Sequence, residues 1–259
     1  MSRRLENRVA MVTGGSSGIG KATALQFARE GAKVVIAARR APESIQVVDE
    51  IKSGGGEAIF VQTDVSIWSD VEGLVQETVD LYGRLDCAFN NAGLSGRLTE
   101  DWLGLSEDDW DQTADVNLKG VWMCMRHQIP KMLETGGGTI VNNSSLLGER
   151  GSKSAPYSAT KHGVIGLTRS AAVTFGDQNI RVNAVLPGII MTHIMEARLQ
   201  ENPELTDKAR GVIPMGKVGT SESVAEAVVW LCGDESSYIT GQTLTIDGGV
   251  MAQMVPRTG

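Results

Sequence analysis

Tyr157 and Lys161 are the residues whose types and spacing most directly suggest chemistry. They lie in the segment SAPYSATKHGV, in which the lysine follows the tyrosine by four positions. That spacing places both side chains on one face of a helix, about one turn apart. A phenol has an ordinary pKa of about 10, and an ammonium within about 4–6 Å lowers such a pKa by about 1–3 pH units. The pair therefore predicts a tyrosine that acts as a general acid or base near neutral pH.

An amphipathic helix with a half-buried tyrosine and a solvated lysine would show the same spacing, so a second signal is needed. In the glycine-rich turn VTGGSSGIGKA, Gly14, Gly18 and Gly20 follow a strand pattern and open a helical pattern. Glycines there allow a tight turn and a close approach of the backbone to a pyrophosphate. The start of the helix offers N–H groups and the positive end of its dipole to that anion. The turn predicts a dinucleotide site and favours the catalytic interpretation of Tyr157.

Alternating strand and helix patterns must position these residues. Strands are expected at residues 8–14, 33–38, 57–64, 85–93, 138–145, 179–188 and 241–249. Helices are expected at residues 18–32, 42–56, 69–83, 106–134, around Tyr157, and at 221–233. Strands such as VVIAA are apolar on both faces, which is typical of a parallel sheet covered by helices on both sides. The pattern predicts an α/β fold: one Rossmann-like domain over residues 1–259, with a doubly wound parallel sheet of about seven strands and a substrate-loop insertion at about 189–216.

Composition narrows the class of protein further. The chain has a formal net charge of −7, and its basic residues are scattered. Neither property suggests a nucleic acid or an anionic membrane as a partner. The sequence has no signal-peptide pattern and no run of about 18 apolar residues. Its three cysteines and three histidines are dispersed, so we expect no metal site, no disulfide framework, and a reducing, cytoplasmic location.

The glycine turn, read as T-G-x-x-x-G-x-G from Thr13, resembles that of the short-chain dehydrogenase/reductase family. Further motifs follow in the family's order over nearly the whole chain: Asp64-Val65, NNAG at 90–93, Asn117 in DVNLKG, a serine pair at 144–145, Tyr157-x-x-x-Lys161, PG at 187–188 and IDGG at 246–249. The resemblance implies an NAD(P)-dependent oxidoreductase that transfers a hydride between the nicotinamide and a ketone or secondary alcohol.

The resemblance also implies a catalytic set of Asn117, Ser145, Tyr157 and Lys161. Tyr157 would protonate the forming alkoxide or take the proton of the alcohol, and a serine hydroxyl would bind the carbonyl oxygen. Lys161 would also hydrogen-bond the nicotinamide ribose, and Asn117 would help to hold a water-linked proton path.

The serine assignment has an alternative, Ser144. Ser145 precedes Tyr157 by 12 residues, whereas the family usually shows 13, a spacing that would select Ser144. The family-like SxxG pattern at 145–148 selects Ser145, with one residue missing from the loop GSKSAP. Because side chains alternate along a strand, a one-residue error would point the hydroxyl to the wrong face. Ser145 is therefore the predicted residue.

The resemblance implies cofactor contacts at Gly14, Ser16, Ser17, Gly18, Ile19, Gly20, Arg39, Asp64, Val65, Asn91, Ala92, Gly93, Tyr157, Lys161, Pro187, Gly188, Ile190 and Thr192. An NAD enzyme of this type carries an acidic residue about 20 positions beyond the turn, on the ribose 2′-hydroxyl. Here Ala38 occupies that position and Arg39 follows, with a guanidinium suited to a 2′-phosphate. Ser17 stands where many NADP-using relatives have a basic residue. We expect NADP(H), with NAD(H) as the alternative.

Two further expectations concern the substrate and the assembly. Apolar residues are expected to face the substrate at Leu146, Leu147, 94–98, Met191, Ile194 and Met195, which favours a largely apolar ketone or secondary alcohol. The family commonly forms tetramers, so we expect a homotetramer in which helices near 106–134 and 155–175 pair between subunits, with a monomer as the alternative. The competing functions are a non-catalytic NADP-binding protein and a nucleotide-sugar epimerase or dehydratase.

Overall fold

A computed structural model describes residues 3–97, 101–192 and 210–254. Its centre is a seven-stranded sheet in the order β3-β2-β1-β4-β5-β6-β9, with every neighbouring pair parallel. The strands are β1 Val9–Thr13, β2 Lys33–Ala38, β3 Glu57–Gln62, β4 Cys87–Asn90, β5 Gly138–Asn143, β6 Ile180–Pro187 and β9 Thr243–Ile246. The predicted doubly wound parallel sheet is confirmed.

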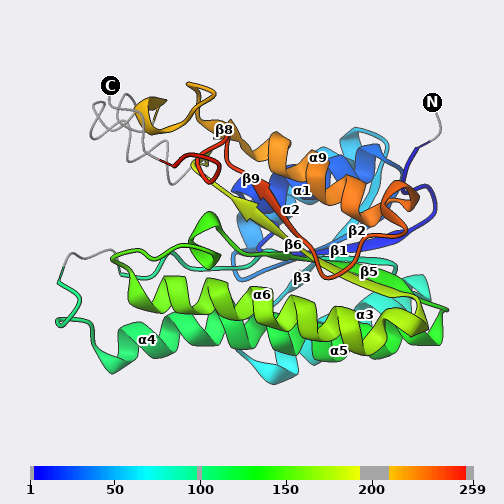
Figure 1. Cartoon of the computed structure of the whole chain (residues 1–259). Helices are drawn as coiled ribbons and strands as arrows, with labels where there is room; N and C mark the ends of the chain where they lie inside the picture. The colour runs from blue at the N-terminus through cyan, green and yellow to red at the C-terminus, as the bar shows by residue number, and fades with distance from the viewer. Residues whose placement is uncertain (1–2, 98–100, 193–209, 255–259) are drawn as a thin grey trace.

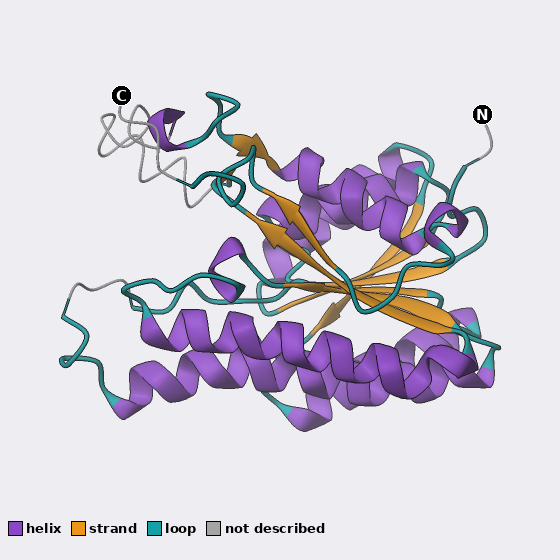
Figure 2. Cartoon of the chain, in the orientation of Figure 1, coloured by secondary structure: helices purple, strands orange, loops and turns teal. Residues whose placement is uncertain are grey.

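Helices cover both faces of the sheet, as Figures 1 and 2 show. One face carries α1 Gly18–Arg29, α2 Ala41–Ser53 and α9 Ser221–Cys232. The other carries α3 Trp68–Tyr82, α5 Gly120–Glu134 and α6 Ala155–Phe175. α4 Glu107–Ala114 precedes α5, and short 3₁₀ turns lie at Leu146–Gly148, Gly176–Gln178 and Asp234–Ser236.

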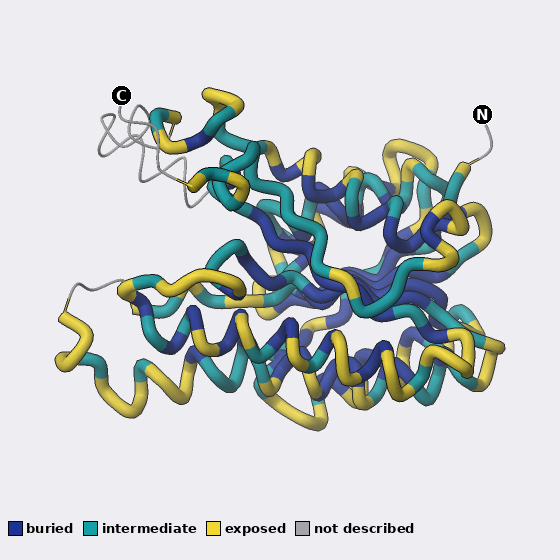
Figure 3. Tube along the Cα trace, in the orientation of Figure 1, coloured by how far each residue is buried: buried dark blue, intermediate teal, exposed yellow. Residues whose placement is uncertain are grey.

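The core lies on both sides of the sheet because its strands are apolar on both faces. In β1, Ala10 and Val12 join the cluster that contains Phe27 of α1, whereas Met11 joins the cluster that contains Val164 of α6. This is the alternation that a strand imposes on successive side chains. Figure 3 shows the central strands as the most continuously buried part of the molecule.

The order of the strands creates a switch point between β1 and β4. The chain leaves β1 toward β2 and β3 on one side, and returns to build β4, β5 and β6 on the other. Ligands of open α/β sheets bind outside the carboxyl ends of the strands at such a point. The glycine turn follows β1 and the NNAG motif follows β4, so the fold brings these two motifs together there.

The helix expected at 106–134 is divided. Ser106 caps α4 through a capping box with Asp109, and a π-helical segment, Asp115–Lys119, separates α4 from α5. Such segments are rare and often lie at functional sites. Asn117 is inside this segment, and its side chain is fully buried.

The expected insertion at 189–216 is described only at its two ends. Ile190–Met191 (β7) and Gly219–Thr220 (β8) form a separate two-stranded sheet that the sequence did not predict, since two residues carry no periodicity. Ile194 and Met195, like Leu98, lie outside the described residues.

Candidate active site

A cavity of about 460 Å³ lies at the carboxyl ends of the central strands. The cofactor residues predicted from the sequence that line it are Gly14, Ser16, Ser17, Gly18, Ile19, Arg39, Asp64, Val65, Asn91, Ala92, Gly93, Tyr157, Lys161 and Thr192. They come from the turns after β1, β2, β3 and β4, from helix α6 and from the segment after β7. The structure thus brings together in one cavity most of the residues that the sequence suggested for a dinucleotide.

Six predicted residues do not line this cavity: Gly20, Asn117, Ser145, Pro187, Gly188 and Ile190. Gly188 packs instead on the IDGG segment, since its N–H donates to Ile246 O at 2.9 Å and a Cβ there would come within 2.7 Å of Asp247 Cβ. The cofactor contacts predicted for Gly20, Pro187, Gly188 and Ile190, and the catalytic roles predicted for Asn117 and Ser145, stay predictions.

The glycine turn is shaped for a close approach of backbone and ligand. Gly14 and Gly18 have φ angles of +66° and +54°, which favour glycine. A Cβ on Gly20 would come within 2.2 Å of Gly14 O, so this glycine allows α1 to pack on the turn. Ser17, at the N-cap of α1, makes no side-chain capping bond. The start of α1 therefore fits a pyrophosphate, which its free N–H groups can bind.

The NNAG motif is bonded directly to this turn. The Thr13 hydroxyl accepts hydrogen bonds from Asn91 N at 3.0 Å and Ala92 N at 3.1 Å. In return, Asn91 Nδ2 donates to Thr13 O at 3.0 Å and to Gly14 O at 3.3 Å. These bonds join the carboxyl ends of β1 and β4 to each other along one side of the cavity.

Two arginines, Arg39 and Arg40, line the end of the cavity that lies away from Tyr157. The sequence predicted a cofactor contact for Arg39 alone. Arg39 Nη1 lies 3.7 Å from Asp64 Oδ2, and its side chain is 62% exposed. Arg40 Nη2 donates to the hydroxyls of Ser16 and Ser17 at 3.0 Å each, so it reaches across the glycine turn. The dipeptide Arg39-Arg40 was visible in the sequence, but which of the two side chains turns toward the glycine motif was not.

The carboxyl of Asp64 stays ionised at this end of the cavity. Its burial raises its pKa, but hydrogen bonds from Ser66 and the charge of Arg39 lower the pKa more. Arg39 is thus already attached to a carboxylate, whereas Arg40 spans the serines of the turn.

The Tyr157–Lys161 pair lies at the opposite end of the cavity. Lys161 is 4% exposed, and its Nζ donates to Asn143 O at 2.7 Å and lies 5.6 Å from the centre of the Tyr157 ring. Burial lowers the pKa of Lys161 to about 8. Burial also raises the pKa of Tyr157, and the Ser145 hydroxyl offsets part of that rise. The predicted lowering of the tyrosine pKa is therefore wrong for this structure, because burial raises that pKa by more than the Ser145 hydroxyl lowers it.

The two adjacent serines have different partners. Ser144 Oγ donates to the main-chain oxygen of Lys161 at 2.8 Å. The Ser145 hydroxyl accepts from Leu147 N at 3.1 Å and lies close enough to the Tyr157 phenol to lower its pKa. Alternation at the end of β5 thus sends Ser145 to the phenol and Ser144 to the backbone of the helix.

The side chain of Asn117 binds the main chain of the loop after β4. Its Oδ1 accepts from Leu94 N at 2.7 Å, and its Nδ2 donates to Leu94 O at 2.8 Å. Both bonds hold the chain just beyond NNAG, next to Lys161. The predicted water-linked proton path through Asn117 stays a prediction.

Asn143 is a residue of the site that the sequence analysis missed. It lines the cavity, its Nδ2 donates to Asn91 Oδ1 at 2.9 Å, and its Oδ1 is buried without a hydrogen-bond partner among the described residues. Its main-chain oxygen holds Lys161 Nζ. A polar residue at the end of the strand that precedes the serine pair was the available signal. The other lining residues absent from the predicted cofactor set are Ala37, Ala38, Arg40, Thr63, Leu94, Ser95 and Val116.

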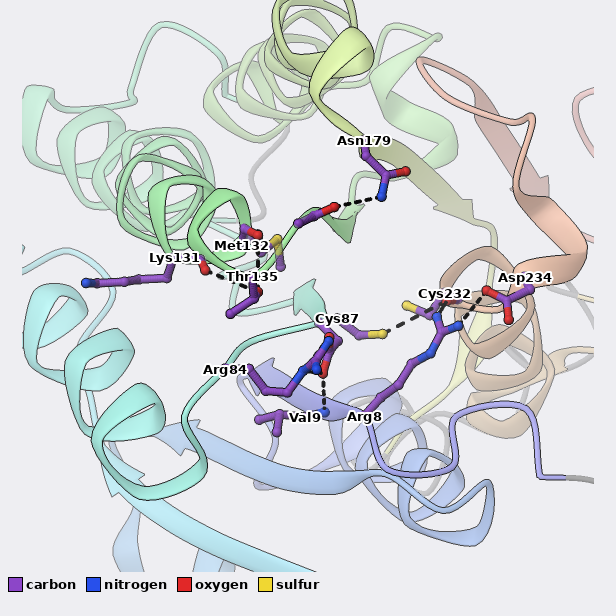
Figure 4. Close-up of polar contacts among 12 residues, drawn as sticks. Arg8, Val9, Arg84, Cys87, Lys131, Met132, Thr135, Asn179, Cys232 and Asp234 are labelled. Atoms are coloured by element: carbon purple, nitrogen blue, oxygen red, sulfur yellow. Dashed lines mark hydrogen bonds and ion pairs between the residues drawn. The ribbon is translucent and has the colours of Figure 1, made fainter.

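A second cavity, of about 370 Å³, lies at the amino ends of the strands. Its charged groups bind one another: Arg8 Nη1 donates to Cys232 O at 2.9 Å and the same guanidinium pairs with Asp234, as Figure 4 shows. Arg84 Nε donates to both carboxylate oxygens of Asp86, at 2.9 and 2.8 Å. The charged groups of Arg8 and Arg84 are thus bound to other parts of the chain.

In the described part of the chain, no group of three or more histidine, cysteine or acidic side chains is placed to hold a metal ion. None of the helices described is long and apolar enough to cross a membrane.

Comparison with known proteins gives the same family for the whole chain. The family profile described as enoyl-(acyl carrier protein) reductase matches residues 14–251. An A-factor type γ-butyrolactone 1′-reductase (1S-forming) of Streptomyces virginiae is 40% identical over 248 residues, covering 95% of this chain and 96% of the relative. A cyclohexanol dehydrogenase of Acinetobacter sp. (strain SE19) is 39% identical over 251 residues, covering 96% of each chain.

A solved structure agrees at the level of the fold. The crystal structure of levodione reductase superposes with a TM-score of 0.90 at 34% identity, covering 96% of this chain and 99% of that one. Fold, motifs and relatives coincide over nearly the full length, and the chain therefore belongs to the short-chain dehydrogenase/reductase family of oxidoreductases, which act on alcohol and ketone groups.

Proposed function

We propose that this protein is an NADP(H)-dependent oxidoreductase that interconverts a ketone and a secondary alcohol, with Tyr157 as the general acid or base. The observation that carries the proposal is the shared cavity: Tyr157 and Lys161 line one end of it, and the glycine turn lines the floor. A dinucleotide bound along this cavity would bring its reactive ring to the tyrosine.

The residues present fit a nicotinamide dinucleotide. Gly14, Gly18 and the first turn of α1 would hold the pyrophosphate, since φ angles and the uncapped helix start leave their N–H groups available. Asp64 and Val65 would hold the adenine, and Lys161 the nicotinamide ribose. When bound, the dinucleotide supplies or accepts the hydride.

The chain's own residues would handle the proton. Because burial raises the pKa of Tyr157, the phenol is protonated at neutral pH and can donate a proton to an alkoxide oxygen. The Ser145 hydroxyl lies close enough to the Tyr157 phenol to lower its pKa, so one carbonyl oxygen could bind both hydroxyls. Lys161 would favour the phenolate that remains, as an ammonium beside it.

The preference for NADP(H) is supported at the other end of the cavity. Ala38 offers no carboxylate to a ribose 2′-hydroxyl, and the guanidinium groups of Arg39 and Arg40 lie beside Asp64 and across the serines of the turn. A guanidinium suits a phosphate dianion. An NAD-dependent reaction in the same cavity is the alternative.

The substrate is proposed to be a largely apolar ketone or secondary alcohol. Leu94 lines the cavity, and the half-buried Leu146 and Leu147 follow Ser145 directly. Two of the relatives are named a cyclohexanol dehydrogenase and a γ-butyrolactone reductase, which supports cyclic substrates as the first to try. The substrate loop at about 189–216 stays a proposal, since residues 193–209 lie outside the described part of the chain.

A homotetramer in the cytoplasm is proposed for the assembly and location. Trp110, Trp122 and Val173 are exposed apolar side chains on α4, α5 and α6, and a Cβ on Gly166 would meet nothing, so this surface could receive a second copy. Ala171 and Ala172, by contrast, pack in the core and are not available for that contact. Three free, buried cysteines support a reducing compartment.

Light scattering at micromolar concentration tests the assembly. We expect a mass near four times the 27.6 kDa of one chain, and smaller, folded species for Gly166→Glu, which would place a buried charge in the contact. A wild-type mass near that of one chain would contradict the proposed tetramer.

An activity screen tests the function. The purified protein is mixed with NADPH or NADH and a panel of cyclic, open-chain and acyl-thioester ketones, and oxidation of the dinucleotide is followed at 340 nm. We expect turnover of at least one apolar ketone, faster with NADPH. Tight binding of NADPH with no turnover of any ketone in the panel would favour a non-catalytic NADP-binding protein.

A further inference from the structure

Three consecutive residues at the end of β5 hold the Tyr157–Lys161 pair. Asn143 O accepts from Lys161 Nζ at 2.7 Å, Ser144 Oγ donates to Lys161 O at 2.8 Å, and the Ser145 hydroxyl lies close enough to Tyr157 to lower the pKa of its phenol. Lys161 is thus fixed both at the tip of its side chain and at its main chain. Of the three, Ser144 has no assigned part in the proposed reaction.

The Ser144 contact is enclosed. Ser144 is 3% exposed, and the 3₁₀ turn Leu146–Gly148 folds over it. A Cβ on Gly148 would come within 2.5 Å of Ser144 Oγ and 2.9 Å of Lys161 O, so a glycine is needed for strand and helix to meet here. Water has little room to replace this bond once it is removed.

The bond is not required to satisfy the carbonyl that accepts it. Lys161 lies in the interior of α6, where each main-chain oxygen already accepts an N–H from the next turn. A second donor that comes from β5 instead ties the helix to the sheet. Thr160 offers the contrast, because its Oγ1 donates to Tyr157 O at 2.8 Å from within the same helix and cannot fix that helix against β5.

We propose that Ser144 is a positioning residue. It fixes the position and rotation of α6 relative to the sheet, so that Lys161 keeps its hydrogen bond to Asn143 O and Tyr157 keeps its place beside the Ser145 hydroxyl. The inference rests on the proposed function, since it assigns Ser144 a part in that site. A displacement of about 1 Å in a catalytic group can lower turnover by about 100-fold. One buried bond at the base of the pair can therefore matter although Ser144 touches no reacting atom.

The test compares Ser144→Ala with Thr160→Val, which each remove one hydroxyl that donates to the main-chain oxygen of a catalytic-pair residue. We expect Ser144→Ala to lower kcat by about 10- to 100-fold with KM for the ketone within about 3-fold of wild type. Thr160→Val is expected to keep kcat within about 3-fold. Circular dichroism checks that both variants are folded, and Ser144→Cys, which has similar size but a weak donor, replaces Ser144→Ala if that variant does not fold.

The pH profile separates positioning from a general structural effect. Burial holds the pKa of Lys161 at about 8, and Tyr157 is its titratable neighbour on α6, with Asn143, Ser144 and Asn117 as the neutral groups around it from β5 and the π-helical segment. If α6 shifts in Ser144→Ala, the amine gains hydration and its pKa rises, so the alkaline limb of kcat/KM moves to higher pH. A partly unfolded variant would lose activity equally at every pH.

Three outcomes overturn the inference: Ser144→Ala with kcat within about 3-fold of wild type, an unmoved alkaline limb, or an equal loss in Thr160→Val. These are distinct from failure of the proposed function, in which the wild-type protein itself shows no turnover, and that result would overturn both.

Discussion

The two ends of the sheet hold polar groups in opposite ways. At the amino ends, the carboxylate of Asp86 accepts hydrogen bonds from the guanidinium of Arg84 and raises its pKa, so the two opposite charges form an ion pair. Asp86 also accepts from Val9 N at 2.8 Å. At the carboxyl ends, Lys161 is held by a carbonyl oxygen, and burial lowers its pKa to about 8. Burial also lowers the pKa of Arg181 at the amino ends, but a guanidinium keeps its charge near neutral pH, whereas an amine with a pKa of about 8 can lose its charge there. The contrast separates a stabilising end from a reactive end.

The largest effect expected at the reactive end is that of Tyr157→Phe. This change removes the hydroxyl and keeps the ring, so turnover should fall by about 10²–10⁴-fold while folding and binding of NADPH persist. Steady-state kinetics and a fluorescence titration of the dinucleotide measure the two. More than a tenth of wild-type turnover would remove Tyr157 from the mechanism.

At the stabilising end, Asp86→Ala should act on stability instead. It leaves Val9 N–H buried without its acceptor and Arg84 without its carboxylate, which should lower the free energy of unfolding by about 2–3 kcal/mol. Asp86→Asn can keep the bond to Val9 and should cost less. Urea unfolding of both variants, with kcat at low temperature as the control, checks this. An Asp86→Ala protein of normal stability and low kcat would contradict the stabilising role of the amino ends.

The cofactor end gives a smaller effect. Arg40→Ala should raise KM for NADPH by about 10-fold and leave KM for NADH nearly unchanged, since it removes one charged contact to the proposed 2′-phosphate. Arg39→Ala is the matched comparison, and it should do less because Arg39 already lies 3.7 Å from the carboxylate of Asp64. Equal changes for both dinucleotides would mean that neither arginine recognises the phosphate.

The smallest predicted effect is on pH. Because the pKa of Lys161 is lowered to about 8, the ammonium that supports Tyr157 is present below that pH and is lost above it. In the ketone-reducing direction kcat/KM should therefore fall to about half its plateau near pH 8 and continue to fall at higher pH. A plateau that extends to pH 10 would show that Lys161 is better hydrated than its burial indicates.

Local patterns in the sequence predicted the fold and much of the site, because spacing along one element settles them. A separation of four residues places Tyr157 and Lys161 on one face of α6. The glycines around Gly14 indicate a turn directly after β1. Strand alternation separated Ser144 from Ser145, and the structure gives the two hydroxyls different partners.

What the sequence could not provide depends on contacts between distant segments. The part played by Asn143 requires the neighbouring ends of β4 and β5, which bring it to Asn91. The direction of Arg40 is set where α2 begins, in a loop without periodicity. The pKa of Tyr157 depends on how much of the chain covers it, and spacing to Lys161 alone predicted the wrong sign.

Transfer of deuterium tests the central claim most directly. The wild-type protein is incubated with NADPH that carries deuterium at both positions of C4 of the nicotinamide and with a ketone that the screen has identified, and the product is analysed by mass spectrometry and NMR. A ketone reductase that works in the carboxyl-end cavity should place one deuterium on the carbinol carbon of the alcohol, and Tyr157→Phe should all but abolish this product. An alcohol formed without deuterium, or formed equally well by Tyr157→Phe, would contradict the account.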